Sequence, residues 1–149
     1  MSKRTKYWVV PAILLILVAI PLGLRHGRPW YSQPQQIYRD NQDALEAIAE
    51  QYLADGTVSY PEIKGVIAVN AWPGDAPILE FITQGDGIAP AGTYRGIYYS
   101  VNGQPSAFQG GPQALIPDDE GGWRWQGSGD NGGRTRCIQG SWYAFEAHF

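Results

Sequence analysis

The sequence predicts an α+β protein in which an N-terminal transmembrane helix precedes one amphipathic helix packed on a twisted antiparallel meander sheet. Residues 7–24 form an uncharged apolar run, and residues 33–54 repeat apolar side chains at helical spacing. Residues 56–149 hold 17 of the 19 glycines, placed between short apolar runs as in β proteins. We therefore expect four parts: a cytoplasmic tail (1–6), a transmembrane helix (7–24), a juxtamembrane connector (25–32) and an extracytoplasmic α+β domain (33–149).

The first element is the apolar run YWVVPAILLILVAIPLGL at residues 7–24. At about 1.5 Å per residue it makes a helix of roughly 27 Å, close to the ~30 Å hydrocarbon thickness of a bilayer. Pro11 and Pro21 lie near its ends, so neither interrupts its middle. A cleaved secretory signal and a buried core helix are the alternatives, but residues 19–23 offer no A-x-A-like cleavage site and the core helix is the weaker of the two. We expect an uncleaved, single-pass anchor in the cell membrane.

The charges that flank this run predict its orientation. Three basic residues (Lys3, Arg4 and Lys6) precede it and two (Arg25 and Arg28) follow it, which favours a cytoplasmic N-terminus and an extracytoplasmic C-terminal domain. Residues 25–149 carry 8 basic and 14 acidic side chains, and 8 − 14 gives a net charge of −6. An acidic domain without a basic stripe excludes nucleic acid as an expected partner.

The second element is an amphipathic helix over residues 33–54. Ser32 and Gln35 have the spacing of a capping box, and Gly56 is suited to the left-handed position after the helix end. The apolar positions that recur at helical spacing are Ile37, Ala44, Leu45, Ile48 and Tyr52, and the charged positions Arg39, Asp40, Asp43, Glu46 and Glu50 are expected to face water.

The third element is the sheet. The expected strands are residues 65–71, 78–83, 93–101, 113–116, 122–126, 135–138 and 142–148. Asn102-Gly103 predicts a two-residue hairpin between the third and fourth of these, and residues 118–122 (DDEGG) predict a longer turn. Because no helical pattern separates the strands, an antiparallel meander is the simplest topology.

Three C-terminal stretches carry a resemblance: TYRGIYYSVNGQPSAFQG (93–110), GWRWQGSGDNGG (122–133) and SWYAFEAHF (141–149). They resemble stretches of small uncharacterised membrane-anchored extracytoplasmic proteins of Gram-positive bacteria. The resemblance implies a bacterial cell-envelope location and no known activity.

Catalytic and metal-binding motifs are scarce. The two histidines, His26 and His148, lie far apart in the sequence, and no serine or cysteine stands in a nucleophile motif. Cys137 with His148 has no zinc-site spacing, and the acidic turns lack the full spacing of a calcium loop. We therefore expect no cofactor, no metal and no enzyme. A hydrolase that uses two carboxylates stays open, with the candidate acids Glu62, Glu80, Asp86 and Glu146.

Aromatic residues are the feature that stands out. Trp123 and Trp125 alternate along one strand and project from the same face, with Arg124 between them. These three residues and Trp142 are the candidate ligand-binding residues, since exposed tryptophan suits stacking on sugar rings or contact with a partner chain. Packing of these aromatics in the core is the favoured alternative, because aromatic pairs across strands are usually structural.

These observations predict a binding or interaction domain rather than an enzyme. The leading expectation is contact with a protein partner in a cell-envelope assembly. The alternative is a cell-wall glycan-binding module that uses exposed tryptophan and tyrosine, and the third is the carboxylate hydrolase.

The lone cysteine allows no disulfide within one chain. In the expected strand 135–138, Cys137 alternates with Arg136, so an outward Arg136 predicts an inward thiol. We expect Cys137 to be a buried, small apolar residue.

The orientation is tested by a reporter that is active only outside the cytoplasm, fused after Phe149. The fusion is expected to be active, and replacing Lys3, Arg4 and Lys6 with neutral residues is expected to scramble insertion because the charge bias is small. Activity of a matched cytoplasmic reporter at the same position would contradict the orientation.

Overall fold

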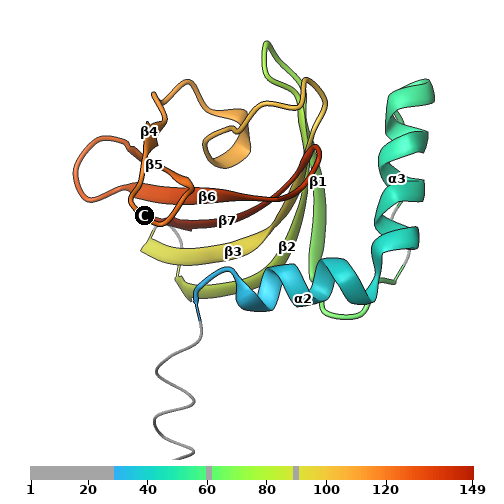
Figure 1. Ribbon diagram of the computed structural model, residues 1–149, viewed down its shortest axis with the longest axis horizontal. Coiled ribbons are helices and arrows are strands. Elements are labelled where there is room, and N and C mark those ends of the chain that lie inside the picture. Colours follow the sequence, from blue (N-terminus) through green and yellow to red (C-terminus); the bar gives the residue numbers. More distant parts are fainter. Residues whose placement is uncertain (1–28, 60–61, 89–90) are drawn as a thin grey trace, which may run out of the picture. The chain divides into compact units, whose positions relative to one another are not determined.

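In the described part of the chain, two α-helices pack against a seven-stranded antiparallel sheet, which confirms the α+β class (Figure 1). The computed structural model describes residues 29–59, 62–88 and 91–149, and residues 31–149 form one compact unit. The expected transmembrane helix at residues 7–24 lies outside the described residues. Within the described ranges, no helix has the length and apolar character needed to cross a membrane.

Along the chain, the two α-helices come before the seven strands. The helices are α2 (Ser32–Asp40) and α3 (Gln42–Asp55), and the short 3-10 helix η1 (Phe108–Gly110) lies between the third and fourth strands. The strands are β1 (Ala68–Trp72), β2 (Ile78–Ile88), β3 (Ala91–Ser100), β4 (Ile116–Pro117), β5 (Trp123–Gln126), β6 (Gly132–Gln139) and β7 (Trp142–His148).

The expected single helix at residues 33–54 is two helices, which is a correction. Asn41 lies between them with φ −129°, and its side-chain amide donates hydrogen bonds to the carbonyl oxygens of Ile37 (2.8 Å) and Lys64 (3.2 Å). An asparagine side chain that binds nearby carbonyls competes with helix continuation. The stop at Gly56 is confirmed by its φ of +72°, whereas α2 begins without a side-chain cap, so the Ser32 capping box was wrong.

The sheet order β1-β2-β3-β7-β6-β5-β4 corrects the expected single meander. Strands β1 to β3 form one antiparallel meander and β4 to β7 form a second, and the pairing of β3 with β7 joins them. A turn does form at Gly103, whose φ is +69°, but the chain then leaves β3 because β7 occupies the neighbouring position. The expected strand at residues 113–116 is accordingly reduced to the two-residue β4.

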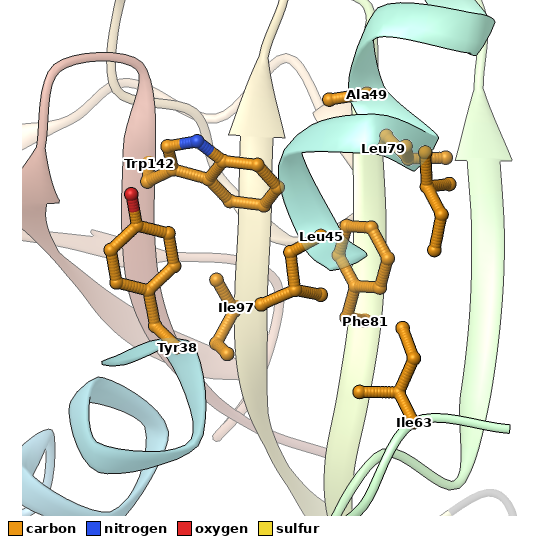
Figure 2. Close-up of a cluster of buried hydrophobic side chains, with 9 residues drawn as sticks. Tyr38, Leu45, Ala49, Ile63, Leu79, Phe81, Ile97 and Trp142 are labelled. Atoms are coloured by element: carbon orange, nitrogen blue, oxygen red, sulfur yellow. The ribbon is translucent and has the colours of Figure 1, made fainter. Parts of the chain in front are cut away.

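Helices α2 and α3 cover one face of the sheet, called here the helix-covered face (Figure 2). Trp142 of β7 lies there against Tyr38 of α2, with ring centroids 5.3 Å apart, and against Phe81 of β2 at 5.7 Å. Leu45 of α3 is fully buried in the same cluster. This cluster attaches the helices to the central strands, because apolar side chains removed from water stabilise the contact.

The segment between β3 and β4, residues 101–115, crosses the other face and is called the crossing loop. Figure 1 shows it lying over the strands on the side away from α2. Tyr98 accepts a hydrogen bond from the backbone N–H of Ser106 (2.8 Å), and the Tyr143 hydroxyl donates to the carbonyl oxygen of Gly103 (2.9 Å). The Tyr98 and Tyr143 rings stack at 5.1 Å beneath it. This loop-covered face is therefore a second core.

Cys137 is exposed, which corrects the expectation that its thiol is buried. Strand β5 pairs with β6 only as far as Thr135, so beyond Thr135 the strand β6 has a neighbour on one side only, which is β7. The pairing of β6 with β7 also shifts register between Cys137 and Gln139. Alternation along a strand predicts burial only where a covering layer extends over that position, and here it does not.

Trp142 is expected to dominate the stability of the helix-covered core. Trp142→Ala should lower the free energy of unfolding by about 3–5 kcal/mol, because it leaves a cavity between α2 and the sheet. Urea unfolding of the full chain in detergent, followed by near-ultraviolet circular dichroism, measures the change. Leu53→Ala is the matched control: Leu53 is exposed on α3, so its loss should shift the free energy by no more than about 0.5 kcal/mol. Equal effects of the two substitutions would contradict the packing.

Candidate ligand-binding site

A glutamate lies in the middle of an otherwise apolar strand. Glu80 belongs to the run ILEFIT of β2, and strand alternation places it on the same face as Ile78 and Ile82. This is the loop-covered face, and Glu80 is only 1% exposed there. A carboxylate is almost never this buried without specific partners.

Three N–H groups donate to the Glu80 carboxylate. The Asn70 amide and the Trp72 indole both reach Oε1, at 3.3 and 3.2 Å, and both residues belong to the paired strand β1. The third donor is the backbone N–H of Gln109 in the crossing loop. The ion pairs within the described part of the chain join Arg95 and Arg134 to Glu146, and none involves Glu80. Its charge is thus hydrogen-bonded but not neutralised.

Burial raises the pKa of Glu80 from its ordinary value of 4.5 to about 7. The hydrogen bonds from Trp72, Asn70 and Gln109 act in the opposite direction, because they favour the charged form. Removal of the carboxylate from water outweighs them. Near neutral pH, Glu80 therefore exists in both protonation states, as acid–base and ligand-binding groups often do.

The crossing loop holds an unusual conformation at the point where it meets Glu80. Gln109 has φ +59°, the left-handed region that residues other than glycine seldom adopt. Its side chain is exposed while its N–H points to the carboxylate. Such a conformation persists where surrounding contacts hold it, and it is frequent at ligand sites.

Beside Glu80 lies an open pocket of about 510 Å³, called the Glu80 pocket. Tyr94, Phe108 and Phe149 form its aromatic wall, with ring centroids 5.8 Å apart for Tyr94–Phe108 and 5.2 Å apart for Phe108–Phe149. Its remaining lining residues are Ile67, Ala68, Asn70, Ile82 and Gln109. A mostly apolar pocket of this size with a few convergent polar groups is typical of small-molecule sites.

A second pocket of about 290 Å³ lies on the other side of Phe108 and Gln109. Trp125 lines it, together with Trp72 and a set of polar side chains: Gln109, Gln113, Ser128 and Asn131. This second pocket is more polar in its lining residues than the Glu80 pocket. The crossing loop thus separates two openings on one face of the sheet.

The four ligand-binding residues expected from the sequence do not come together. Trp125 lines the second pocket, and Trp123 packs edge-on against Tyr143 at 6.3 Å on the same face. Arg124 is exposed on the opposite face, where it lines a third pocket with Asp118, Asp119, Glu120 and Arg134. Trp142 is buried under the helices, which corrects its assignment to a binding surface. Core packing accounts for Trp142 because β7 is a central strand.

Of the four candidate acids, Glu80 lines an open pocket with mostly apolar walls. Glu146 lies on the opposite face of the sheet, between Arg95 and Arg134. Glu62 and Asp86 are exposed. A pair of carboxylates on one face, as a hydrolase of this kind requires, does not form from Glu80 and Glu146.

Sequence reasoning missed the partners of Glu80: Asn70, Trp72 and Gln109. A local signal for the burial of Glu80 was present in the sequence. Strand alternation puts Glu80 on the same face as Ile78 and Ile82, and apolar residues at both positions indicate a buried face. No local pattern predicts that Gln109 reaches it, because Gln109 lies 29 positions further along the chain.

In the acidic turn at residues 118–122, the Asp118 carboxylate stabilises the backbone of the turn. Asp118 accepts hydrogen bonds from the N–H groups of Glu120 (3.0 Å) and Gly122 (2.7 Å), which is ordinary turn chemistry. Among the residues that the structure describes, no group of three or more His, Cys, Asp or Glu side chains is placed to hold a metal ion.

No protein-family model, curated protein or solved structure matches this chain.

Glu80 is expected to give the fold a distinctive pH dependence. Its pKa is raised in the folded state, so the folded protein binds more protons than the unfolded chain between pH 4.5 and about 7. Stability contributed by this group is therefore full below pH 4.5 and falls by about 3 kcal/mol as pH rises through 7.

Urea unfolding at several pH values, compared between the wild type and Glu80→Gln, isolates this effect. The free energy of unfolding of the wild type minus that of Glu80→Gln should fall by about 3 kcal/mol between pH 4.5 and 8. A constant offset added by the substitution does not affect this change. A difference that is independent of pH would show that the carboxylate is not buried as described.

Proposed function

We propose that this chain is a membrane-anchored extracytoplasmic binding domain whose ligand site is the Glu80 pocket. Residues 7–24 would anchor it in the cell membrane, with the N-terminus in the cytoplasm and the domain outside. The observation that carries the binding function is the buried Glu80 carboxylate at an open pocket with an aromatic wall. The ligand that suits it is a small molecule with an apolar body.

The energetics of the pocket support binding. Burying Glu80 costs folding free energy above about pH 7, and the left-handed conformation at Gln109 adds strain. Apolar residues of similar volume would make a more stable core at this position. A stability cost of this kind is commonly retained at functional sites.

Exposed apolar residues at the rim of the pocket are a second argument for ligand binding. Ile67 lines the pocket and is 66% exposed, although large aliphatic side chains usually avoid water. Ala68, the next residue, is also exposed and lines the pocket from the edge strand β1. An apolar ligand or partner segment seated there would remove this surface from water.

A second candidate function, cell-wall glycan binding, is favoured by the second pocket. Trp125 and Trp72 supply aromatic surface there, and Gln113, Ser128 and Asn131 supply hydrogen-bonding groups. Sugars are recognised by this combination of ring stacking and polar contacts. Trp125 is only 5% exposed, which limits the stacking surface and places this candidate second.

Binding is tested with the isotope-labelled full chain in nanodiscs of zwitterionic lipid. Benzyl alcohol, a neutral aromatic probe, should shift the amide signals of residues 67–70, 80–82 and 108–109 in a saturable way. Ala68→Phe should abolish these shifts, because the added ring fills the pocket from an exposed edge-strand position. Nuclear magnetic resonance titration gives the dissociation constant for each protein.

The matched control is Ala114→Phe, which adds the same ring to an exposed position of the crossing loop outside the pocket lining. It should leave the shifts unchanged. A chitin oligosaccharide that shifts signals near Trp125 and Asn131, while benzyl alcohol shifts none, would establish the glycan function instead. Saturable shifts that survive Ala68→Phe would overturn the assignment of the site.

A further inference from the structure

We infer that the Glu80 pocket selects organic cations: a small apolar or aromatic body that carries a protonated amine, with the ammonium group against the Glu80 carboxylate. This inference rests on the proposed function, since it names the ligand class for the same pocket.

The groups that donate to the Glu80 carboxylate are all neutral. An ionised carboxylate accepts about four hydrogen bonds. Asn70, Trp72 and the Gln109 backbone supply three N–H donors, and all three donors are neutral. An ammonium group would add a further donor and, unlike these three, a positive charge.

Among the described residues, no cationic side chain forms an ion pair with Glu80. The described part of the chain places no basic side chain in the lining of the Glu80 pocket, and its arginine ion pairs engage Glu146 on the other face. A buried charge without a counter-charge is costly, so a ligand that brings the counter-charge gains more here than at a solvated carboxylate. A neutral ligand of the same shape lacks that gain.

The wall of the pocket suits a cation as well as an apolar body. Tyr94, Phe108 and Phe149 contact one another and present ring surfaces to the space beside Glu80. Aromatic faces attract ammonium groups through the ring quadrupole, and they also exclude water from the apolar part of the ligand. The acidic domain, with net charge −6 over residues 25–149, further favours cations over anions.

Glu80 is the group expected to titrate near neutral pH in this environment. Asn70 and Trp72 face it from β1, Tyr98 lies opposite it in β3, and Gln109 faces it from the crossing loop. The first two and Gln109 do not titrate. Burial raises the pKa of Tyr98, so its phenol stays neutral throughout this range. Cation selectivity should therefore rise with pH as Glu80 loses its proton.

The test compares benzylammonium with benzyl alcohol, which have the same ring and differ in charge. The full chain in zwitterionic nanodiscs is titrated with each probe at pH 5.5 and pH 8, and the Trp72 indole N–H signal is followed because that group donates to Glu80. Trp72→Phe identifies the signal among the six tryptophans. An alkyl amine keeps its proton across this range, so changes with pH report the protein.

At pH 8 the wild type should bind benzylammonium at least tenfold more tightly than benzyl alcohol, and the ratio should fall toward one at pH 5.5. Glu80→Gln, which keeps the side-chain shape and removes the charge, should bring the ratio close to one at both pH values. The pH dependence of the wild type is an independent measurement should Glu80→Gln fail to fold.

Two results would overturn the inference in distinguishable ways. If benzyl alcohol binds the pocket and benzylammonium binds no more tightly at pH 8, or if Glu80→Gln keeps the preference, the cation class is wrong and the binding function stands. If neither probe binds the wild type in a way that Ala68→Phe removes, the proposed function fails and the inference fails with it.

Discussion

Pairing between β3 and β7 is the interaction on which the rest of the structure depends. Ten-residue β3 belongs to the first meander and β7 is the last strand of the second, so this one ladder joins the two halves of the sheet. Because β7 occupies the position beside β3, the chain that leaves β3 cannot return along it and instead crosses the face of the sheet to reach β4. The crossing loop, and with it the contact between Gln109 and Glu80, is a consequence of that pairing.

Both cores meet at β7. Its alternation places Trp142 against α2 on one face and Tyr143 and Phe145 under the crossing loop on the other. A strand that is apolar on both faces belongs in the middle of a covered sheet, because either face would otherwise expose aromatic surface to water. In the same arrangement, β1 and β4 are the edge strands of the sheet. The Glu80 pocket opens beside β1, where the crossing loop covers the sheet only in part.

Glu80 connects folding with the proposed function. Its carboxylate ties β1 to the crossing loop through Asn70 and Gln109, so it contributes to the order of the pocket, yet its burial without a counter-charge opposes folding above about pH 7. A cationic ligand would relieve that cost, and ligand binding and stability would then be coupled through one side chain.

The sequence alone determined the class of the fold and most of its strands, because alternation and glycine-rich turns are local signals: β1, β2, β3, β5, β6 and β7 all overlap the expected segments. Sequence reasoning named Glu80 as a candidate acid but did not use its alternation with Ile78 and Ile82, which is the local signal for its buried face. Tertiary structure alone decided that Asn41 divides the helix, that β7 lies beside β3, that Cys137 is exposed and that Trp142 is core. It also decided that Gln109 reaches Glu80. The strand order, the two burial states and the Gln109 contact depend on which distant segment covers a given strand, and Asn41 is bonded in part to the distant carbonyl of Lys64. Local spacing carries no information about either.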